Sequence, residues 1–591
     1  MWALVENNKK LISTSQNTDT RRDIFDVSDK VIPVSLIYSV LILIPLCLFT
    51  FRFTDNNRLL SWSWSISWPQ LLLLLGVLSC MLLIITVASQ GLSQHLSQRK
   101  GVYMLPMLAL AAAIPFWQQP EIIIDNSRYF SQAKFLELYG VAYFLQEWGN
   151  SIFVWTDLPL IPLLYGLVFQ VVGEQRAAIQ LINSLFFSGT LLTTYLLGKN
   201  LWGHERGMLG AILLLAIPYI YNQLPLMLVD IPAMFFLSLS LLVSLLAVKH
   251  GGRRYFALAA VTIVLAMLTK YSIWLMLSVI PMLLFISNKK FGLEKKIILS
   301  RLMVIATGVL FLSAIIVFMK YDVIRQQLSF LFSYQWSGLA RWQESNVSSF
   351  FFHIHPLVSL LALAAVVVAF KKRDYHFLII AWLPLLVVML EVKRMRYLIP
   401  VLPMIALMAA YALAELKNSC HKSFVAYGAA GTAFLIALTM STGFLQNTSA
   451  SNIKSAGGYL NGMNIGVAEV VVLPQHRSVV NPVITIPTLD YFTDKALVYR
   501  QDQSFNSKQI PEHVYTSSVR FTWEYTLPSY YFQTDSSEHI DKALVVVFSD
   551  QKQLETEKLQ QLLKHYRIAK SFDQTTRVFK YQTFLNTYEP I

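Results

Sequence analysis

Long apolar runs alternate with short polar turns along most of the chain. Runs of roughly 15 to 25 apolar residues can cross a bilayer as helices, and about thirteen are present. They fall near residues 31–52, 69–91, 102–117, 177–197, 206–222, 231–248, 255–269, 271–287, 301–319, 356–370, 376–391, 398–414 and 424–445. A further run at 158–173 contains Pro159 and Pro162, which favours a helix lying at the membrane interface. The pattern predicts a polytopic α-helical membrane protein.

Composition agrees with this prediction. Of 591 residues, 55% are hydrophobic and 14% charged, and the mean hydropathy is +0.50, which is typical of membrane proteins. The three cysteines are too scattered for a disulfide framework or a zinc site. The net charge is +14, but no basic stretch outside the apolar region is interleaved with aromatic residues, so no nucleic-acid partner is expected.

The distribution of Lys and Arg orients the spans. If the polar segment 1–30 is cytoplasmic, every second loop is basic, as cytoplasmic loops are. An odd number of spans then puts the outer loop 118–176, the turns at Asp230 and Lys270, and everything after residue 446 outside. All candidate functional groups therefore share one compartment, for which we expect the periplasmic side of a bacterial inner membrane.

After residue 446 the composition becomes that of a soluble domain of ordinary size. Residues 467–473 and 543–548 predict buried strands, 552–566 an amphipathic helix, and 577–583 a last strand. We expect a soluble, periplasmic or lumenal α/β domain over 446–591, following a transmembrane domain over 31–445.

Three acidic residues stand at the outer ends of the spans. Asp125 opens the outer loop, and a helix starting there would project Arg128 and Tyr129 onto the same face. Asp157 closes that loop, so the two carboxylates can meet, one of them as a general base. Asp230 stands between apolar runs, where a carboxylate costs roughly 2.5 to 3.5 kcal/mol at the bilayer centre. A helix cap is the alternative interpretation for each acid.

Cations gather at the same ends. Lys270, followed by Tyr271, interrupts an apolar run and either snorkels at a tight turn or binds an anion. The segment 391–397 places three cations on the side of the membrane that is usually poor in them. Because arginine recognises phosphate through its planar donor fork, this segment predicts an anionic ligand such as a lipid phosphate. A structural ion-pair cluster with Glu391 is the alternative.

Two histidines, His353 and His355, stand before the run at 356–370. A metal site would need a third ligand, and none lies near in sequence, so an interfacial hydrogen-bonding role is favoured. No cofactor is expected, with a divalent metal left as an open alternative.

In their order, these residues resemble the C-type (GT-C) glycosyltransferases that use polyprenyl-phosphate sugars. The resemblance is to the branch holding protein O-mannosyltransferases and the lipid A aminoarabinose transferase, and it covers about residues 102–445. It is carried by Asp125-Asn126-Ser127-Arg128-Tyr129, Asp157-Leu158-Pro159-Leu160, residues 196–203, Asp230, residues 268–270 and residues 393–400.

The resemblance implies that Asp125 is the catalytic carboxylate and that Lys270, Arg394 and Arg396 are partners of the donor's lipid phosphate. Asp157 is the second catalytic candidate, because it stands at the other end of the same loop. The substrate-binding candidates are Arg128, Tyr129, Asp230, Lys270, Tyr271, His355, Glu391, Lys393, Arg394, Arg396 and Tyr397. Asn126 stands where the family usually has an acid, and Asp157-Leu158 where a basic or His residue followed by two prolines is common. These departures put the acceptor side in doubt.

The implied reaction moves a sugar from a polyprenyl-phosphate donor to a lipid A, glycan or protein acceptor, with inversion at the anomeric carbon. Membrane lipids are the other expected partners. The rival classes are a transporter or flippase, with Asp230 and Lys270 as a coupling pair at the midplane, and a non-catalytic scaffold. Charges at the outer ends of spans, rather than in mid-helix, favour the enzyme.

Overall fold

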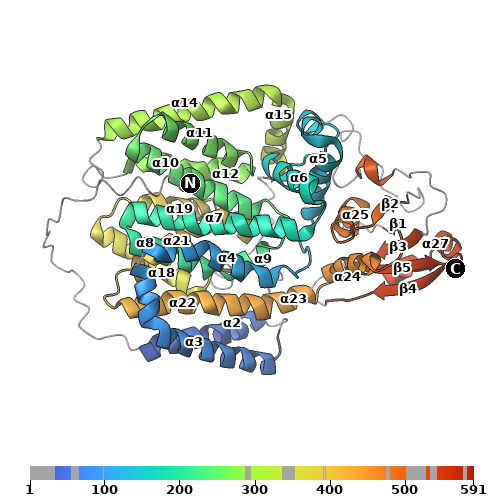
Figure 1. Cartoon of the computed structure of the whole chain (residues 1–591), viewed down its shortest axis with the longest axis horizontal. Helices are drawn as coiled ribbons and strands as arrows, with labels where there is room; N and C mark the ends of the chain where they lie inside the picture. The colour runs from blue at the N-terminus through green and yellow to red at the C-terminus, as the bar shows by residue number, and fades with distance from the viewer. Residues whose placement is uncertain are drawn as a thin grey trace.

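The computed structural model describes residues 34–54, 66–97, 99–285, 294–335, 353–390, 392, 394–473, 480–500, 527–532, 542–576 and 582–591. They form a bundle of helices with a smaller α/β domain at one end (Figure 1). The helices α5 and α6 lie at the end of the bundle that faces this domain (Figure 1).

Most of the helices follow the predicted apolar runs, whereas the helices over 126–147 and 321–330 lie outside those runs. They are α2 (Val34–Thr54), α3 (Trp68–Ser97), α4 (Met104–Ala113), α5 (Asn126–Glu147), α6 (Leu160–Val172), α7 (Arg176–Trp202), α8 (His204–Leu215), α9 (Pro218–Gln223), α10 (Asp230–His250), α11 (Arg253–Met267), α12 (Tyr271–Met276), α14 (Lys295–Met319), α15 (Tyr321–Phe330), α18 (Pro356–Lys372), α19 (Phe377–Met389), α20 (Met395–Leu398), α21 (Leu402–Leu413), α22 (Ser419–Ile436) and α23 (Thr442–Gln446). The run at 206–222 is divided between α8 and α9, because Pro218 begins a new helix after the extended Ile217.

Six helical stretches within the described ranges are long and apolar enough to cross a membrane. They are Trp68–Gln94, Arg176–Trp202, Asp230–His250, Lys295–Met319, Met395–Leu413 and Ser419–Gln446. Five shorter apolar helices accompany them. The prediction of a polytopic helical membrane protein is therefore confirmed, whereas the number of thirteen crossings stays a prediction.

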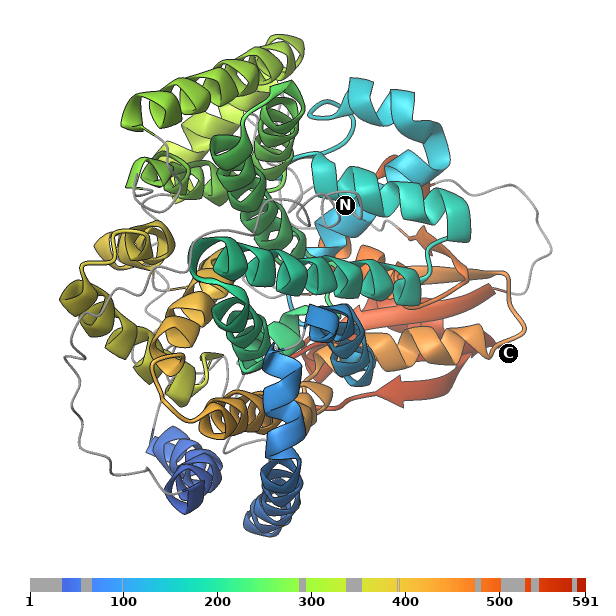
Figure 2. The ribbon, with the colours of Figure 1, turned by 60° about the vertical axis from the view of Figure 1, so that its left-hand side comes forward.

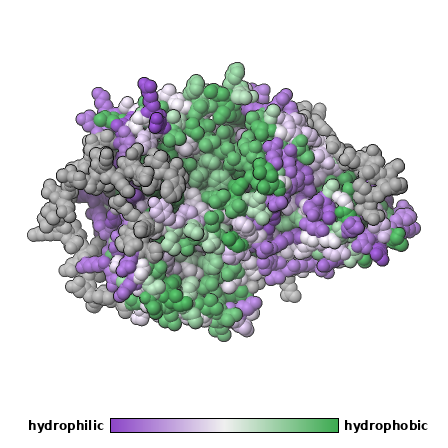
Figure 3. Space-filling model, viewed as in Figure 1, coloured by the Kyte–Doolittle hydropathy of each residue, from purple (hydrophilic) through white to green (hydrophobic). Residues whose placement is uncertain are grey.

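Hydrophobic side chains form a band across the helical part, with hydrophilic residues on both sides of it (Figure 3). On α14 the band includes Leu310, Phe311 and Phe318, which are 66 to 88% exposed. α14 lies at the opposite edge of the bundle from α2 and α3 in both ribbon views (Figures 1 and 2). Such continuous apolar exposure is the surface that lipid tails cover in an integral membrane protein.

The C-terminal domain contains a five-stranded mixed sheet in the order β2-β1-β3-β5-β4. β1 pairs in parallel with β2 and β3, and β5 pairs antiparallel with β3 and β4. The strands are β1 (Val467–Val472), β2 (Ala496–Tyr499), β3 (Lys542–Phe548), β4 (Tyr566–Phe572) and β5 (Phe584–Pro590), and the helices are α24 (Ala450–Asn461), α25 (Pro482–Asp490) and α27 (Glu557–Leu563). The predicted α/β character and the strands at β1 and β3 are confirmed.

Two predicted elements of this domain were wrong in extent. The helix expected over 552–566 is limited to α27, because Asp550 and Gln553 form a capping box on a separate 3-10 turn and Thr556 is extended. Tyr566 already begins β4, which hydrogen-bonds to β5. The last strand begins at Phe584 rather than at 577, and residues 577–581 lie outside the described ranges.

Candidate active site

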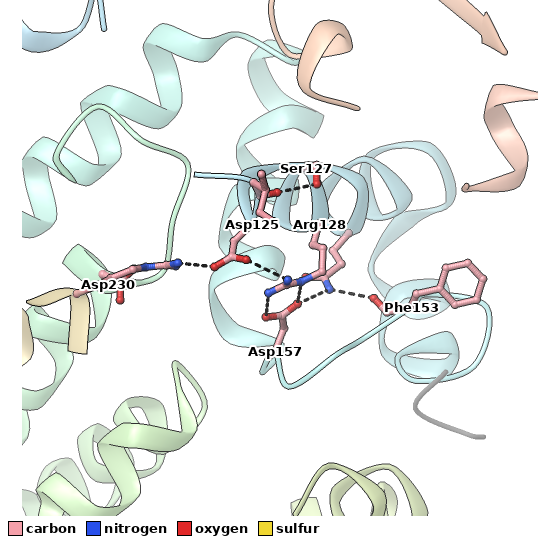
Figure 4. Close-up of polar contacts among 9 residues, drawn as sticks. Asp125, Ser127, Arg128, Phe153, Asp157 and Asp230 are labelled. Atoms are coloured by element: carbon pink, nitrogen blue, oxygen red, sulfur yellow. Dashed lines mark hydrogen bonds and ion pairs between the residues drawn. The ribbon is translucent and has the colours of Figure 1, made fainter. Parts of the chain in front are cut away.

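The start of α5 brings two acids onto one arginine. Asp125 directly precedes the helix but forms no capping hydrogen bond. Arg128 donates from Nη1 to Asp125 Oδ1 at 3.1 Å, and from Nε and Nη2 to the Asp157 carboxylate at 2.8 and 2.9 Å. Figure 4 shows both carboxylates turned toward the guanidinium. The side chain of Gln132, one helical turn further on, also donates to Asp157, at 3.1 Å.

A second arginine, distant in sequence, also binds Asp125. Arg396 of α20 is hydrogen-bonded through Nη1 to Asp125 Oδ2, and it donates through Nε to Asp230 Oδ2 at 2.6 Å. Lys270 Nζ lies 2.6 Å from the other oxygen of Asp230. Acids and bases thus alternate in one ion-pair row: Asp157, Arg128, Asp125, Arg396, Asp230 and Lys270.

Local backbone structure explains how the row is assembled. Lys270 stands in the break between α11 and α12, where its backbone is extended and forms a β-bridge with Asp157. Asp230 is the first residue of α10, and no side-chain cap forms there. Neither Asp125 nor Asp230 caps its helix, so the capping alternative does not explain these two residues. α6 likewise begins without a side-chain cap, because Asp157 is bound to Arg128 instead.

Burial differs along the row. The side chain of Asp230 is 1% exposed and that of Asp157 3%, whereas Asp125 is 23% exposed. Burial alone would raise the pKa of the Asp125 carboxyl, but the charges of Arg128 and Arg396 outweigh it and hold the pKa well below its ordinary range. Asp125 is therefore a carboxylate at neutral pH, and a weak base while both arginines are bound to it.

Five of the six residues of the ion-pair row, all except Asp230, line a cavity of about 880 Å³, a volume within the usual range for a small-molecule site. The charged lining consists of Asp125, Arg128, Asp157, Lys270, Arg394 and Arg396. Aromatic rings come from Tyr129, Trp155, Tyr271, Trp274 and Tyr397. Most of the remaining lining is apolar and includes Leu328, Leu331, Phe332, Leu383, Leu386 and Leu390. The cavity can thus hold a charged group and an apolar group at the same time.

Other predicted residues take supporting positions. The ring of Tyr397 lies between two cations, with Lys270 Nζ 4.6 Å and Arg394 Cζ 5.6 Å from its centroid. The hydroxyl of Tyr271 donates to Gln327 Oε1 at 2.7 Å. Arg128 lies 5.6 Å from the ring centroid of Tyr129.

Asp230 does not line the cavity itself and reaches it only through its ion pairs with Lys270 and Arg396. His355 is a second predicted residue that does not line the cavity. It is buried, and its Nδ1 accepts a hydrogen bond from Leu357 N at 3.2 Å, so that it caps α18. Glu391 and Lys393 lie outside the described residues. Within the described ranges no group of three His, Cys, Asp or Glu side chains is arranged to hold a metal ion.

Sequence reasoning missed Gln132, Trp155 and Trp274. Gln132 follows Arg128 by four positions, so helical periodicity could have placed both on one face. The two tryptophans lie on separate segments and carry no comparable local signal.

A membrane bundle with a charged cavity at the end that carries a soluble α/β domain has the features expected of the GT-C class. Residues 157–321 match the sequence model of the family described as dolichyl-phosphate-mannose-protein mannosyltransferase. Among curated proteins, none matches the sequence significantly.

The fold is similar to that of ArnT from Cupriavidus metallidurans bound to undecaprenyl phosphate, with a TM-score of 0.52 and 12% identity, over 83% of this chain and 98% of that one. The apo form of ArnT gives a TM-score of 0.49 and 13% identity, over 81% of this chain and 97% of that one. The oligosaccharyltransferase of Archaeoglobus fulgidus gives 0.42 and 11%, over 78% of this chain and 71% of that one. The family model and the likeness to the ligand-bound ArnT confirm the predicted class, a GT-C glycosyltransferase.

Proposed function

We propose that the chain transfers a sugar from a polyprenyl-phosphate donor to an acceptor on the extracytoplasmic face, with Asp125 as the catalytic carboxylate. The observation that carries the proposal is a single cavity that is lined both by charged residues of the ion-pair row and by many apolar side chains. A lipid phosphate has the matching chemistry, because its anionic head needs cations and its tail needs apolar surface. The undecaprenyl phosphate bound to ArnT and the dolichyl-phosphate donor of the matched family support this ligand class.

The proposal includes an orientation and a division of the chain. The segment 1–30 is cytoplasmic, residues 31–445 cross the bacterial inner membrane thirteen times, and residues 446–591 are periplasmic. The support is that α5, α6 and the C-terminal domain lie at one end of the bundle (Figure 1). The pairs of Arg206 and Lys372 with Glu415 belong to loops that the positive-inside rule assigns to the cytoplasm.

Donor binding would raise the pKa of Asp125 toward its ordinary value. In the ion-pair row, Arg396 is shared between Asp125 and Asp230. A donor phosphate next to Lys270 and Arg394 competes for the same guanidinium. When Arg396 turns to the phosphate, Asp125 loses one of its two cations, and its pKa returns toward the ordinary value. The donor would in this way make Asp125 a better base.

In the transfer step, the acceptor oxygen attacks the anomeric carbon from the face opposite the phosphate, and the bond from that carbon to the phosphate oxygen breaks. Asp125 takes the proton from an acceptor hydroxyl, which is typically worth about 10²–10⁴ in rate. Lys270, Arg394 and Arg396 stabilise the leaving lipid phosphate as its charge develops. An acceptor phosphate is already ionised, and Asp125 then mainly orients it.

The rival transporter class also predicts an ion pair between Asp230 and Lys270, and this pair forms. A coupling pair at the membrane midplane would lie within interrupted spans. Here Asp230 begins α10 and Lys270 links α11 to α12, so both residues lie at helix ends. This position favours the enzyme.

The test uses the purified full chain with a labelled polyprenyl-phosphate sugar and membrane extract as a source of acceptors. We expect release of free lipid phosphate together with labelling of the acceptor. A transporter would move the intact donor across reconstituted vesicles, and a scaffold would do neither. Intact donor after prolonged incubation with several sugars and acceptors would overturn the proposal.

A further inference from the structure

A second buried group of charges joins the C-terminal domain to α5. Lys134 of α5 lies between two carboxylates, with Nζ 2.8 Å from Glu174 Oε1 and 2.7 Å from Asp490 Oδ2. Glu174 belongs to the link between α6 and α7, and Asp490 is the last residue of α25. The hydroxyl of Tyr531 donates to Asp490 Oδ2 at 2.6 Å. We call Lys134, Glu174, Asp490 and Tyr531 the docking cluster.

The docking cluster is closed by aromatic side chains. Lys134 Nζ lies 5.6 to 5.7 Å from the ring centroids of Phe130, Tyr530 and Tyr531. The hydroxyl of Tyr530 donates to the carbonyl oxygen of Ser131 at 3.4 Å. Asp490 and Tyr531 are buried. Buried charges that lose a partner are costly, so the cluster favours one docked arrangement of three segments over all others.

The turn of α5 that binds the domain also binds the active site. Ser131 and Lys134 contact the C-terminal domain, while Gln132 between them donates to the Asp157 carboxylate at 3.1 Å and to Phe153 O at 2.9 Å. Lys134 follows Asp125 by nine residues, which is about 14 Å along a helix. The domain can therefore set the position of Asp125 through a single rigid helical segment.

The hydrophobic core of the domain reaches the same loop at two further points. Ile124, the neighbour of Asp125, and Trp155, two residues before Asp157, both pack against this core. The domain therefore supports both ends of the loop that carries the two acids, in addition to the helix between them.

We propose that the C-terminal domain is a positioning element of the active site, and that the docking cluster holds α5 so that Asp125 and Arg128 face the cavity. This inference rests on the proposed transfer reaction. The cations assigned to the donor phosphate belong to other segments. Lys270 lies in the link between α11 and α12, and Arg396 lies in α20. A loosened docking cluster therefore moves the acids relative to a bound donor and leaves donor binding in place.

The experiment compares Tyr531→Phe and Lys134→Met with the wild-type full chain, measuring kcat, KM for the donor and donor-binding stoichiometry. Tyr531→Phe keeps the ring and removes the hydroxyl. We expect kcat to fall about tenfold in both variants, because a small misplacement of reacting groups has large effects on rate. Donor KM should stay within about twofold. Lys134→Arg keeps the charge and should recover part of the lost kcat.

Arg500→Met is the matched control, because it removes an ion pair of the same domain, 3.1 Å from Glu469, outside the docking cluster. We expect wild-type kcat from it. Three results would overturn the inference: wild-type kcat in Tyr531→Phe and Lys134→Met, an equal loss in Arg500→Met, or a loss that matches the fraction no longer able to bind donor. Absence of transfer in the wild-type chain would instead overturn the proposed function, and the inference with it.

Discussion

The ion-pair row and the docking cluster are two buried charge groups joined by α5, and they differ in what lies beside them. The row has three acids and three bases in alternation, and it faces a cavity of about 880 Å³. The docking cluster has one cation between two carboxylates and is closed by aromatic rings. Buried charge alone therefore does not mark the active site, since the residues of the docking cluster are not among those that line this cavity.

The two groups also respond to protons in opposite ways. In the row, two arginines hold the pKa of Asp125 below its ordinary range. In the docking cluster, burial raises the pKa of Glu174 to about 8, and the charge of Asp490 adds to this effect, against the opposing effect of Lys134. Near neutral pH Asp125 is therefore a carboxylate, whereas the docking cluster holds an extra proton.

The largest expected effect comes from breaking the row at Arg396. Arg396→Met leaves Asp125 and Asp230 without their shared cation, and losing one partner of a buried pair costs about 3–5 kcal/mol. We expect a lower melting temperature and a loss of kcat/KM of at least about a hundredfold. Arg396→Lys keeps the charge but cannot donate to both carboxylates in the same geometry. Its melting temperature and kcat/KM should therefore lie between those of the wild type and Arg396→Met. Wild-type donor affinity and stability in Arg396→Met would contradict the role of the row.

A smaller effect, on the pH dependence of stability, is expected from the proton on Glu174 in the docking cluster. Because the folded pKa of Glu174 is raised above its ordinary 4.5 to about 8, the folded chain binds more protons than the unfolded chain in that interval. Its contribution to stability is thus present at low pH and is lost as the pH rises toward 8. Glu174→Gln stays neutral, so its melting temperature should depend less on pH than that of the wild type.

The other titratable groups that face Glu174 are Lys134 and Glu137 on α5, Asp490 on α25, and Tyr530 and Tyr531. They are present in both proteins, so the difference between the two curves isolates Glu174. Parallel curves for wild type and Glu174→Gln between pH 5 and 9 would show that the proton does not lie on this residue.

The smallest effect is expected at a more exposed pair. Arg206 and Glu415 lie 2.8 Å apart with side chains 26 and 29% exposed. Pairs of this kind contribute about 0–1 kcal/mol, because water already solvates both charges. Glu415→Gln should therefore change kcat and melting temperature little, and a loss comparable to that of Arg396→Met would erase the distinction between buried and exposed pairs.

Features that depend on neighbours in sequence were predictable. The apolar runs became helices, and Asp125, Lys270 and Arg396 stood out because charges beside apolar runs are local anomalies. The pairings were not predictable, since Arg396 meets Asp125 across 271 positions. The sequence analysis singled out neither Lys134 nor Asp490, which meet across 356 positions. Tyr566, the first residue of β4, was assigned to the end of a helix and the rest of β4 was not predicted, because this strand is defined by its pairing with β5.

His355 illustrates a different limit of sequence reasoning. Its place before a span predicted interfacial hydrogen bonding, and it was also among the substrate-binding candidates; in the structure its ring caps α18 through the backbone of Leu357. A capping side chain and a ligand-binding side chain use the same kind of polar residue at the same end of a helix, and only the fold separates them.

The most direct test of the account is the release of free lipid phosphate by wild type, Asp125→Asn and Asp322→Asn. Asp322, in the first turn of α15, is the control, since it is an exposed acid outside the cavity. The account predicts that Asp125→Asn loses about 10²–10⁴ of the transfer rate while donor binding persists, and that Asp322→Asn resembles wild type. Full transfer by Asp125→Asn would contradict it.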